Sequence, residues 1–238
     1  MYTLEIIPGL YQITVRYTNM FLITERSLTL IDAGFRGSMP YVFETIHKLG
    51  REPAEIGLVI LTHNHLDHTG GLDELRTLAS PRVAAHRADV HIPEDTIPYP
   101  GGNYIGKLLK TPVFSRLRRH LVLDGDSIDI KLEGGETFDI LGGLQIVPVP
   151  GHTPGSISLY FPVHKILVVG DALAKRRNVV FMPRKTVSTD LKEAANSLRK
   201  IAGMEVKILL FGHGRPITVD PQGSLKRLAE KLGVVQKE

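Results

Sequence analysis

The sequence contains no cysteine among its 238 residues. Disulfides and thiolate-bound metals are therefore excluded, and any metal site must be built from nitrogen and oxygen ligands. Tryptophan is also absent, and aromatic residues make up only 6% of the chain. Because single-stranded nucleic acids are commonly held by stacking bases on aromatic side chains, this composition argues against a nucleic-acid partner.

Long hydrophobic runs are missing too, since the apolar stretches have the length of strands and fall far short of a membrane span. The N-terminal residues show no basic segment followed by an apolar core, so we expect no secretory signal, no membrane partner and a cytoplasmic location. With 42% hydrophobic residues the chain can bury a sizeable core. Its net charge of +4 suits a small-molecule substrate that is anionic. A homodimer is compatible with the sequence but is not indicated by it.

Hydrophobic patterning predicts two successive groups of strands and helices. We expect strands at 11–17, 20–24, 27–32, 55–62, 81–86, 127–132, 144–150, 156–161, 165–171 and 205–214. We expect helices at 38–50, 71–79, 188–203 and 220–233. Ser38 and Asp190 stand where N-caps belong, and Gly50 and Gly203 stand where helices end. The two halves have a similar order of elements, which predicts two sheets packed face to face with helices outside.

The whole chain, 1–238, is expected to form one domain with an insertion at about 88–120. The insertion combines a segment rich in Pro, Gly and Asn with a basic amphipathic segment. We expect it to cover the pocket as a lid or wall and to influence substrate choice. Tyr99 and Tyr104 are its candidate substrate contacts.

Four loops that follow predicted strands carry side chains that bind metals. The candidate ligands are His63, His65, Asp67, His68, His152, Asp171 and His213. A histidine that stands alone is more often a core or surface residue, so the five other histidines are left out of this set. Seven ligands exceed what one tetrahedral ion takes, which favours two ions about 3.5–4 Å apart. Loops at one rim of a sheet scaffold can bring such side chains together.

These motifs resemble those of the metallo-β-lactamase superfamily. HNHLDHTGG matches its H-x-H-x-D-H signature, and PGHTPGS, GDAL and GHG match its later motifs in the right order. The likeness covers roughly Gly9 to Ile217. It implies an α/β fold, the αββα four-layer sandwich, in which two mixed β-sheets are flanked by helices and a dinuclear site lies at one edge.

The resemblance also implies a role for each candidate ligand. The first ion would be held by His63, His65 and His152, the second by Asp67, His68 and His213, and Asp171 would bridge the two. Asp32, in LIDAG, matches a position that supports the site from behind the ligands.

Differences between this sequence and individual groups within the superfamily reduce the number of activities to consider. Zinc β-lactamases carry Cys or Ser where this chain has Asp171, and flavodiiron proteins have a carboxylate in place of His65. Glyoxalase II shares the bridging aspartate and the GHTPGS loop but has a longer C-terminal helical part. Acyl-homoserine lactonases place a tyrosine where this chain has Ala174.

The sequence therefore predicts a metal-dependent hydrolase that attacks a thioester or lactone with hydroxide formed between two divalent ions. Asp67 and Asp171 are the expected catalytic carboxylates. Zn²⁺ is the expected metal, and iron or manganese would also accept these ligands. Lys175, Arg176 and Arg177, which follow Asp171, are candidates for holding an anionic group. The alternatives are a phosphodiesterase or ribonuclease of the same fold and a mononuclear iron persulfide dioxygenase.

Overall fold

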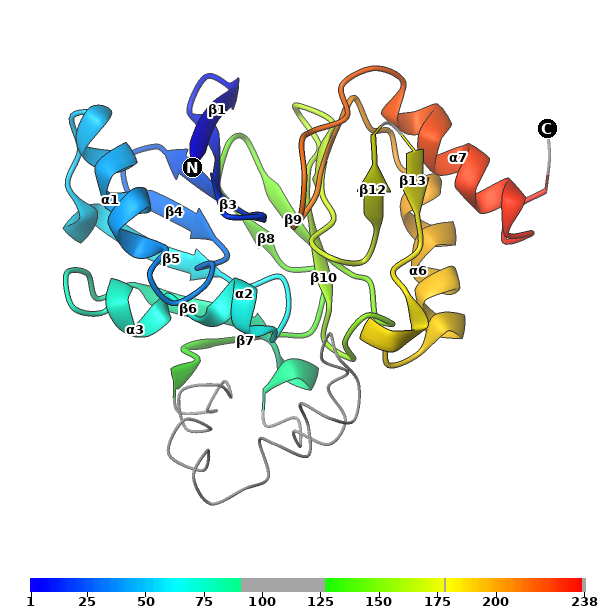
Figure 1. The fold of residues 1–238 in the computed structure, drawn as a ribbon, viewed down its shortest axis with the longest axis horizontal. Helices are drawn as coiled ribbons and strands as arrows, with labels where there is room; N and C mark the ends of the chain where they lie inside the picture. The colour runs from blue at the N-terminus through cyan, green and yellow to red at the C-terminus, as the bar shows by residue number, and fades with distance from the viewer. Residues whose placement is uncertain (91–126, 178, 237–238) are drawn as a thin grey trace.

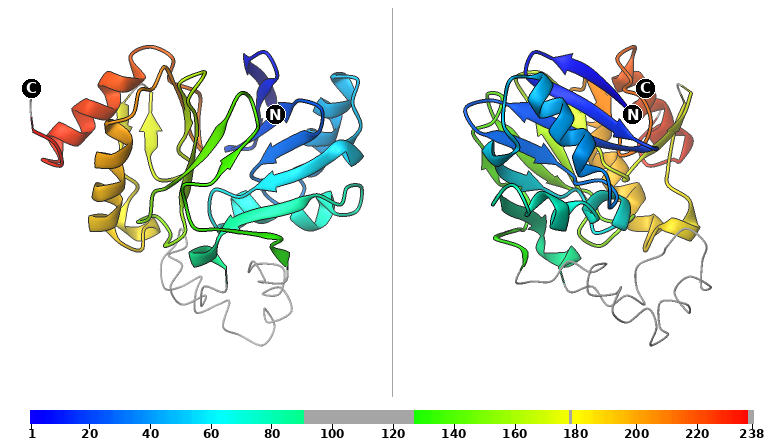
Figure 2. Two further views of the ribbon diagram at one scale, coloured as in Figure 1. Left: turned by 180° about the vertical axis from the view of Figure 1, so that it is seen from behind. Right: turned by 60° about the vertical axis from the view of Figure 1, so that its left-hand side comes forward.

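Two β-sheets lie face to face in the computed structural model, with helices on their outer faces (Figures 1 and 2). The structure describes residues 1–90, 127–177 and 179–236. The predicted αββα four-layer sandwich of two mixed sheets is confirmed. Most of the expected insertion at 88–120, with Tyr99 and Tyr104, lies outside the described residues. The assignment of 1–238 to one domain stays a prediction.

The first sheet has seven strands that follow one another in chain order. They are β1 (Tyr2–Ile7), β2 (Leu10–Val15), β3 (Thr18–Thr24), β4 (Leu28–Ile31), β5 (Ile56–Ile60), β6 (Arg82–His86) and β7 (Ile130–Leu132). Pairing is antiparallel from β1 to β4 and parallel from β4 to β7. The parallel strands all end at the same edge, so the segments that follow β4 and β5 begin side by side.

The second sheet has five strands in the order β14-β11-β10-β9-β8. They are β8 (Thr137–Phe138), β9 (Leu144–Pro148), β10 (Ile157–Phe161), β11 (Ile166–Val168) and β14 (Ile208–Leu210). Only β11 and β14 pair in parallel, and the loops after both strands therefore leave from one edge. A separate hairpin joins β12 (Ala174–Arg176) to β13 (Val179–Phe181).

The helices lie on the two outer faces of the sandwich, except the single turn α2, which lies at its edge (Figure 1). They are α1 (Met39–Lys48), α2 (Leu66–Thr69), α3 (Leu72–Leu75), α6 (Leu191–Ala202) and α7 (Pro221–Lys231). Short 3₁₀ turns are η1 (Pro53–Glu55), η2 (Arg87–Asp89) and η5 (Lys185–Val187). In the part of the chain that the structure describes, no helix has the length and apolar character needed to cross a membrane.

Three buried apolar layers hold the four layers of secondary structure together. Alternate residues of one strand enter different layers, as the period of two of a β-strand requires. In β3, Leu22 packs toward the helical side, whereas Phe21 packs between the sheets. In β11, Val168 packs between the sheets, and Leu167 packs against the layer that contains α6 and α7.

Several local expectations were wrong or incomplete. Strand β1 and the β12–β13 hairpin were not predicted, because neither shows a long β-branched run. The helix expected at 71–79 is a single turn, α3, preceded by α2. Ser38 occupies the N-cap position of α1 but its side chain makes no cap hydrogen bond. The Asp190 carboxylate, in contrast, accepts hydrogen bonds from two backbone amides of α6, as expected.

Candidate metal centre

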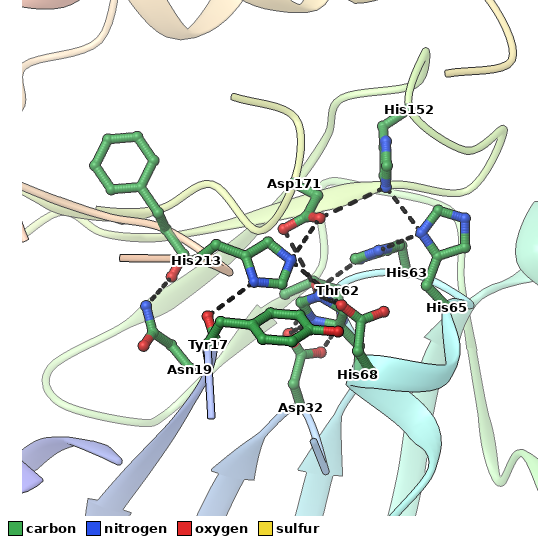
Figure 3. A network of polar contacts seen from close by, with 12 residues as sticks. Tyr17, Asn19, Asp32, Thr62, His63, His65, His68, His152, Asp171 and His213 are labelled. Atoms are coloured by element: carbon green, nitrogen blue, oxygen red, sulfur yellow. Dashed lines mark hydrogen bonds and ion pairs between the residues drawn. The ribbon is translucent and has the colours of Figure 1, made fainter. Parts of the chain in front are cut away.

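The seven candidate ligands meet at one edge of the sandwich, and Figure 3 labels the five histidines and Asp171. The chain leaves β5 and carries four of them in the turn and in α2. The remaining three lie in the loops after β9, β11 and β14, in the order His152, Asp171 and His213. In the sequence, the first and last of the seven candidate ligands, His63 and His213, are 150 positions apart. Convergence of strand ends from both sheets brings them together.

Three imidazoles form the first candidate ligand group. His65 Nδ1 lies 3.1 Å from His63 Nε2 and 2.9 Å from His152 Nε2. Three nitrogen ligands around one tetrahedral zinc ion would lie about 3.3 Å apart, given Zn–N bonds of about 2.0–2.1 Å. All three side chains are buried. Their spacing therefore fits a single cation.

A second group combines Asp67, His68 and His213, whose ligand atoms also lie within 4.8 Å of one another. Asp171 stands between the two groups. Its Oδ2 atom is 3.1 Å from His213 Nε2 and 3.8 Å from His152 Nε2, and its Oδ1 atom is 3.7 Å from His68 Nε2. One carboxylate thus faces ligands of both groups.

Two buried atoms of this cluster would be costly to leave unpaired. His68 Nε2 and Asp171 Oδ1 have no hydrogen-bond partner within the described residues. Burying a polar atom without a partner costs about 1–3 kcal/mol. A cation bound at this point would satisfy both atoms, so the residues present fit a metal site.

Hydrogen bonds behind the ligands orient the imidazole rings. Asp32 Oδ2 accepts from Thr62 Oγ1 and from His68 Nδ1, both at 2.8 Å. Because the single hydroxyl hydrogen of Thr62 points to Asp32, the Thr62 oxygen must accept from His63 Nδ1, 3.0 Å away. Both rings therefore carry hydrogen on Nδ1 and turn Nε2 toward the centre, where it can bind a metal once it carries no proton. Asp32 lies where the sequence placed it, directly behind the ligands.

The His213 ring is also oriented by a hydrogen bond from Nδ1, here to a backbone carbonyl that the sequence did not predict. Its Nδ1 atom donates to the carbonyl oxygen of Tyr17 at 2.9 Å (Figure 3). Its Nε2 atom therefore faces Asp67 and Asp171. The loop that carries His213 is fixed in turn by Asn19, whose amide donates to the carbonyl of Phe211.

Glycine next to Asp171 and His213 serves two different needs. Gly170 has φ +53°, a left-handed conformation that favours glycine. A side chain at Gly212 would instead place its Cβ atom 2.1 Å from Asp171 Oδ1. Gly212 is therefore required because the Asp171 carboxylate packs against it, and not because of its backbone conformation.

Electrostatics divide the histidines into two kinds. Burial lowers the pKa of His63 well below its ordinary value and that of His65 to about 3, so these rings are neutral. Burial also opposes the charging of His68 and His213. However, the carboxylates of Asp32 and Asp171 raise the pKa of His68 to about 9, and those of Asp171 and Asp67 raise the pKa of His213 to about 11. Without a metal, protons on these two rings balance the carboxylates.

Metal binding should consequently release protons. Near pH 7 the metal-free protein carries protons on His68 and His213, because both pKa values lie above that pH. A metal displaces them, so apparent affinity rises with pH and falls by up to about 100-fold for each unit of acidification if two protons leave. Calorimetry in buffers of different ionisation enthalpy measures the number released. Release of no proton at pH 7 would contradict this charge balance.

The sequence matches the family model described as "Metallo-beta-lactamase superfamily" over residues 13–213. The chain belongs to the metallo-beta-lactamase superfamily. Membership in this superfamily implies that the chain binds divalent metal. A protein of Bacillus subtilis named probable metallo-hydrolase YflN is 29% identical, over 97% of this chain and 94% of its own. A hydroxyacylglutathione hydrolase of Cereibacter sphaeroides is 30% identical but matches only 48% of this chain and 33% of its own.

Solved structures of the superfamily share the fold. A family protein from Thermus thermophilus aligns with a TM-score of 0.70 at 22% identity, covering 97% of this chain and 80% of its own. A subclass B3 metallo-beta-lactamase of Bradyrhizobium japonicum aligns with a TM-score of 0.66 at 21% identity, covering 98% and 92%. These likenesses show the architecture, and the relatives named metallo-hydrolases support a metal-dependent hydrolase as the general class.

Asp89 is a residue of this superfamily member that the sequence analysis missed. It is 1% exposed, and its carboxylate accepts hydrogen bonds from the Asn64 amide at 2.9 Å, from Thr153 Oγ1 at 2.7 Å and from the Gly155 amide. Asn64 separates His63 from His65, and Thr153 follows His152. Asp89 thus joins the two loops that carry the first ligand group. It lies in no recognised sequence motif, so the sequence alone did not identify it.

Replacing Asp89 with Asn should weaken the first metal site selectively. Oδ2 accepts from the Asn64 amide and the Thr153 hydroxyl, and Oδ1 accepts from the Gly155 amide, so an Asn side chain with one acceptor oxygen loses at least one of these bonds and loosens the joint between the loops. Loss of such a supporting contact typically lowers metal affinity about 10–100-fold. A two-step metal titration under chelator competition measures each site. Asp129→Asn is a matched control, because its carboxylate accepts from the Val83 amide on β6. Equal weakening of both sites would contradict the assignment.

A cavity of about 570 Å³ opens beside the ligands. It is lined by Tyr17, Phe35, His65, Leu66, Asp67, His152, Asp171, Leu173, Ala174, Phe181, Pro183, Arg184, Val187 and His213. Lys175, Arg176 and Arg177, expected to hold substrate, are not among these residues. The Lys175 ammonium donates to the Arg215 carbonyl at 2.8 Å, and the other two side chains are exposed in the hairpin. Among the described residues that line the cavity, Arg184 is the basic side chain other than histidine.

Proposed function

We propose that this protein is a dinuclear metal-dependent hydrolase of ester-like bonds, acting on a thioester or a lactone. The proposal rests on one observation, the two ligand groups with Asp171 between them. His63, His65 and His152 would hold one ion, and Asp67, His68 and His213 would hold the other. The hydroxyacylglutathione hydrolase relative, whose name denotes a thioester hydrolase, supports the ester-like substrate.

Two divalent ions in this site would polarise a carbonyl oxygen and make a water molecule acidic enough to attack at neutral pH. The chain's own residues arrange that attack. Asp67 lines the cavity and lies 3.3 Å from His213, so its carboxylate can accept a hydrogen bond from the attacking water and orient it. Asp171 keeps both ligand groups at a fixed separation, and Asp32 holds His68 in the required tautomer.

The reaction consumes one water molecule for each ester-like bond. With a thioester, a C–O bond forms at the carbonyl carbon, the C–S bond breaks, and the thiol leaves with a proton from water. Zn²⁺ is the proposed metal because histidine nitrogens and carboxylate oxygens suit it, and iron or manganese would also bind them. A small-molecule partner and a cytoplasmic location stay predictions from the sequence.

Metal analysis combined with a substrate panel tests the proposal. Purified protein should contain close to two divalent ions per chain and should hydrolyse thioesters or lactones in preference to phosphodiesters and β-lactams. Removal of metal with a chelator should abolish turnover, and adding the metal back should restore it. A single ion at full activity, or turnover that survives chelation, would overturn the dinuclear mechanism.

The same assays separate the alternatives raised by the sequence. A ribonuclease would bind RNA with steep salt dependence, because its affinity would come from phosphate contacts. A persulfide dioxygenase would contain one iron per chain and consume oxygen with a persulfide. Neither class gains support from the cavity, whose wall is mostly apolar.

A further inference from the structure

The cavity beside the ligands has an apolar wall that folding does not explain. Its apolar residues are Tyr17, Phe35, Leu66, Leu173, Ala174, Phe181, Pro183 and Val187. Tyr17 is 59% exposed and Phe181 is 36% exposed, although both are large and apolar. Exposed apolar surface gathered beside a reactive centre is typical of a binding site.

The aromatic part of this wall is held in place. The Tyr17 ring meets the Phe35 ring edge-on, with centroids 5.1 Å apart, and lies 5.6 Å from the His213 ring. Tyr17 also fixes His213 through its backbone carbonyl. The wall therefore begins next to a candidate ligand, and a group bound against it would lie beside the scissile bond.

Another part of the wall comes from the β12–β13 hairpin and the segment after it. Phe181 ends β13, and Pro183, Arg184 and Val187 follow. Arg184 brings a permanent positive charge to an otherwise apolar wall. Two divalent ions would exceed the charge of the two carboxylates that line the cavity, Asp67 and Asp171, so the whole cavity would favour a negative ligand.

We propose that the substrate is an amphipathic ester or thioester, with an apolar acyl group that lies against Tyr17 and Phe181 and an anionic group that Arg184 binds. This inference rests on the proposed function and names its substrate class. An acyl group larger than acetyl gains about fourfold in binding for each methylene buried. Pairing an anionic group with an exposed arginine raises binding affinity about fivefold.

Chain length is tested with thioesters that differ only in the acyl group. Hexanoyl thioesters should exceed acetyl thioesters at least about tenfold in kcat/KM, since several methylenes are buried. Phe181→Ala should reduce this ratio by about fivefold. Val179→Ala is the matched control, because Val179 lies on the same strand and is 66% exposed but does not line the cavity. A ratio near one, or equal effects of both variants, would overturn the apolar wall.

The anionic group is tested by binding, without catalysis. S-hexyl mercaptopropionate and its primary amide are thioethers without an ester bond, and they have nearly the same size and shape but differ in charge. Calorimetry on the metal-loaded protein should show that Arg184→Gln weakens binding of the anionic probe about fivefold and leaves the neutral probe unchanged. The neighbouring Lys185→Gln, exposed and outside the cavity lining, should change neither. Equal loss with both probes would overturn the role of Arg184.

The two proposals fail separately. If the thioethers bind with these preferences but no ester or thioester is hydrolysed, the proposed function is wrong and the ligand class is right. If thioesters are hydrolysed without preference for chain length or charge, the hydrolase is right and the inferred substrate class is wrong.

Discussion

Asp171→Ala should remove both metal ions and nearly all turnover at once. Asp171 faces ligands of both groups, with its oxygens 3.1 Å from His213 Nε2 and 3.7 Å from His68 Nε2. Its loss leaves each ion with fewer ligands and removes the negative charge between them. A Lewis-acidic metal contributes several kcal/mol to lowering the barrier, and each ~1.4 kcal/mol is a factor of ten. We therefore expect kcat/KM to fall by about a thousandfold or more.

Metal content and kinetics on the same preparation measure this effect. Asp139→Ala serves as the control, since Asp139 is an exposed carboxylate whose removal makes the same change in net charge. Turnover that persists at wild-type metal content would show that Asp171 does not connect the two ligand groups. Loss of one ion alone would assign Asp171 to a single site.

Asp32→Ala should damage the fold and the second ligand group together. The Asp32 carboxylate is 1% exposed and accepts from the Thr62 amide at 2.7 Å, the Thr62 hydroxyl and His68 Nδ1. Removing it leaves three buried donors without an acceptor, each of which costs about 1–3 kcal/mol. Its φ of +60° adds strain for alanine. We expect the free energy of unfolding to fall by about 3 kcal/mol or more.

Denaturant unfolding and metal titration separate the two consequences. Asp32→Asn retains an acceptor oxygen and tolerates a positive φ, so most of the stability should return. An amide has one acceptor oxygen and no charge, so it cannot replace both Oδ1, which accepts from the Thr62 backbone amide, and Oδ2, which accepts from the Thr62 hydroxyl and His68. Affinity for the second ion should therefore still fall about 10–100-fold. If Asn restores both properties fully, Asp32 acts through backbone conformation and not through His68.

Most of the candidate ligands could be predicted from the sequence because they lie in short motifs. His63 to His68 lie within one turn, and that density of imidazole and carboxylate has few other uses. Asp32 was found through its motif, and its contacts with Thr62 and His68 now give it a physical role. Most strands were predicted from runs of apolar and β-branched residues, which are buried in the structure. Strand β1 was missed because its polar and exposed residues mask the pattern.

The basic run after Asp171 shows why proximity in sequence was a poor guide. Lys175 to Arg177 closely follow Asp171, yet the chain turns into the β12–β13 hairpin there. A β-strand sends neighbouring side chains to opposite faces. Lys175 therefore reaches the carbonyl of Arg215, while Arg184, farther along the chain, lines the cavity.

The amino-acid sequence by itself determined the fold class, the identity of the candidate ligands and the exclusion of thiolates, because these depend on local pattern and composition. Tertiary structure decided which side chains support and surround them. Asp89 braces two ligand loops, Tyr17 orients His213 through a carbonyl, and Phe181 and Arg184 shape the cavity. Such contacts join residues distant in the chain, and their geometry arises only when both sheets pack and their strand ends converge.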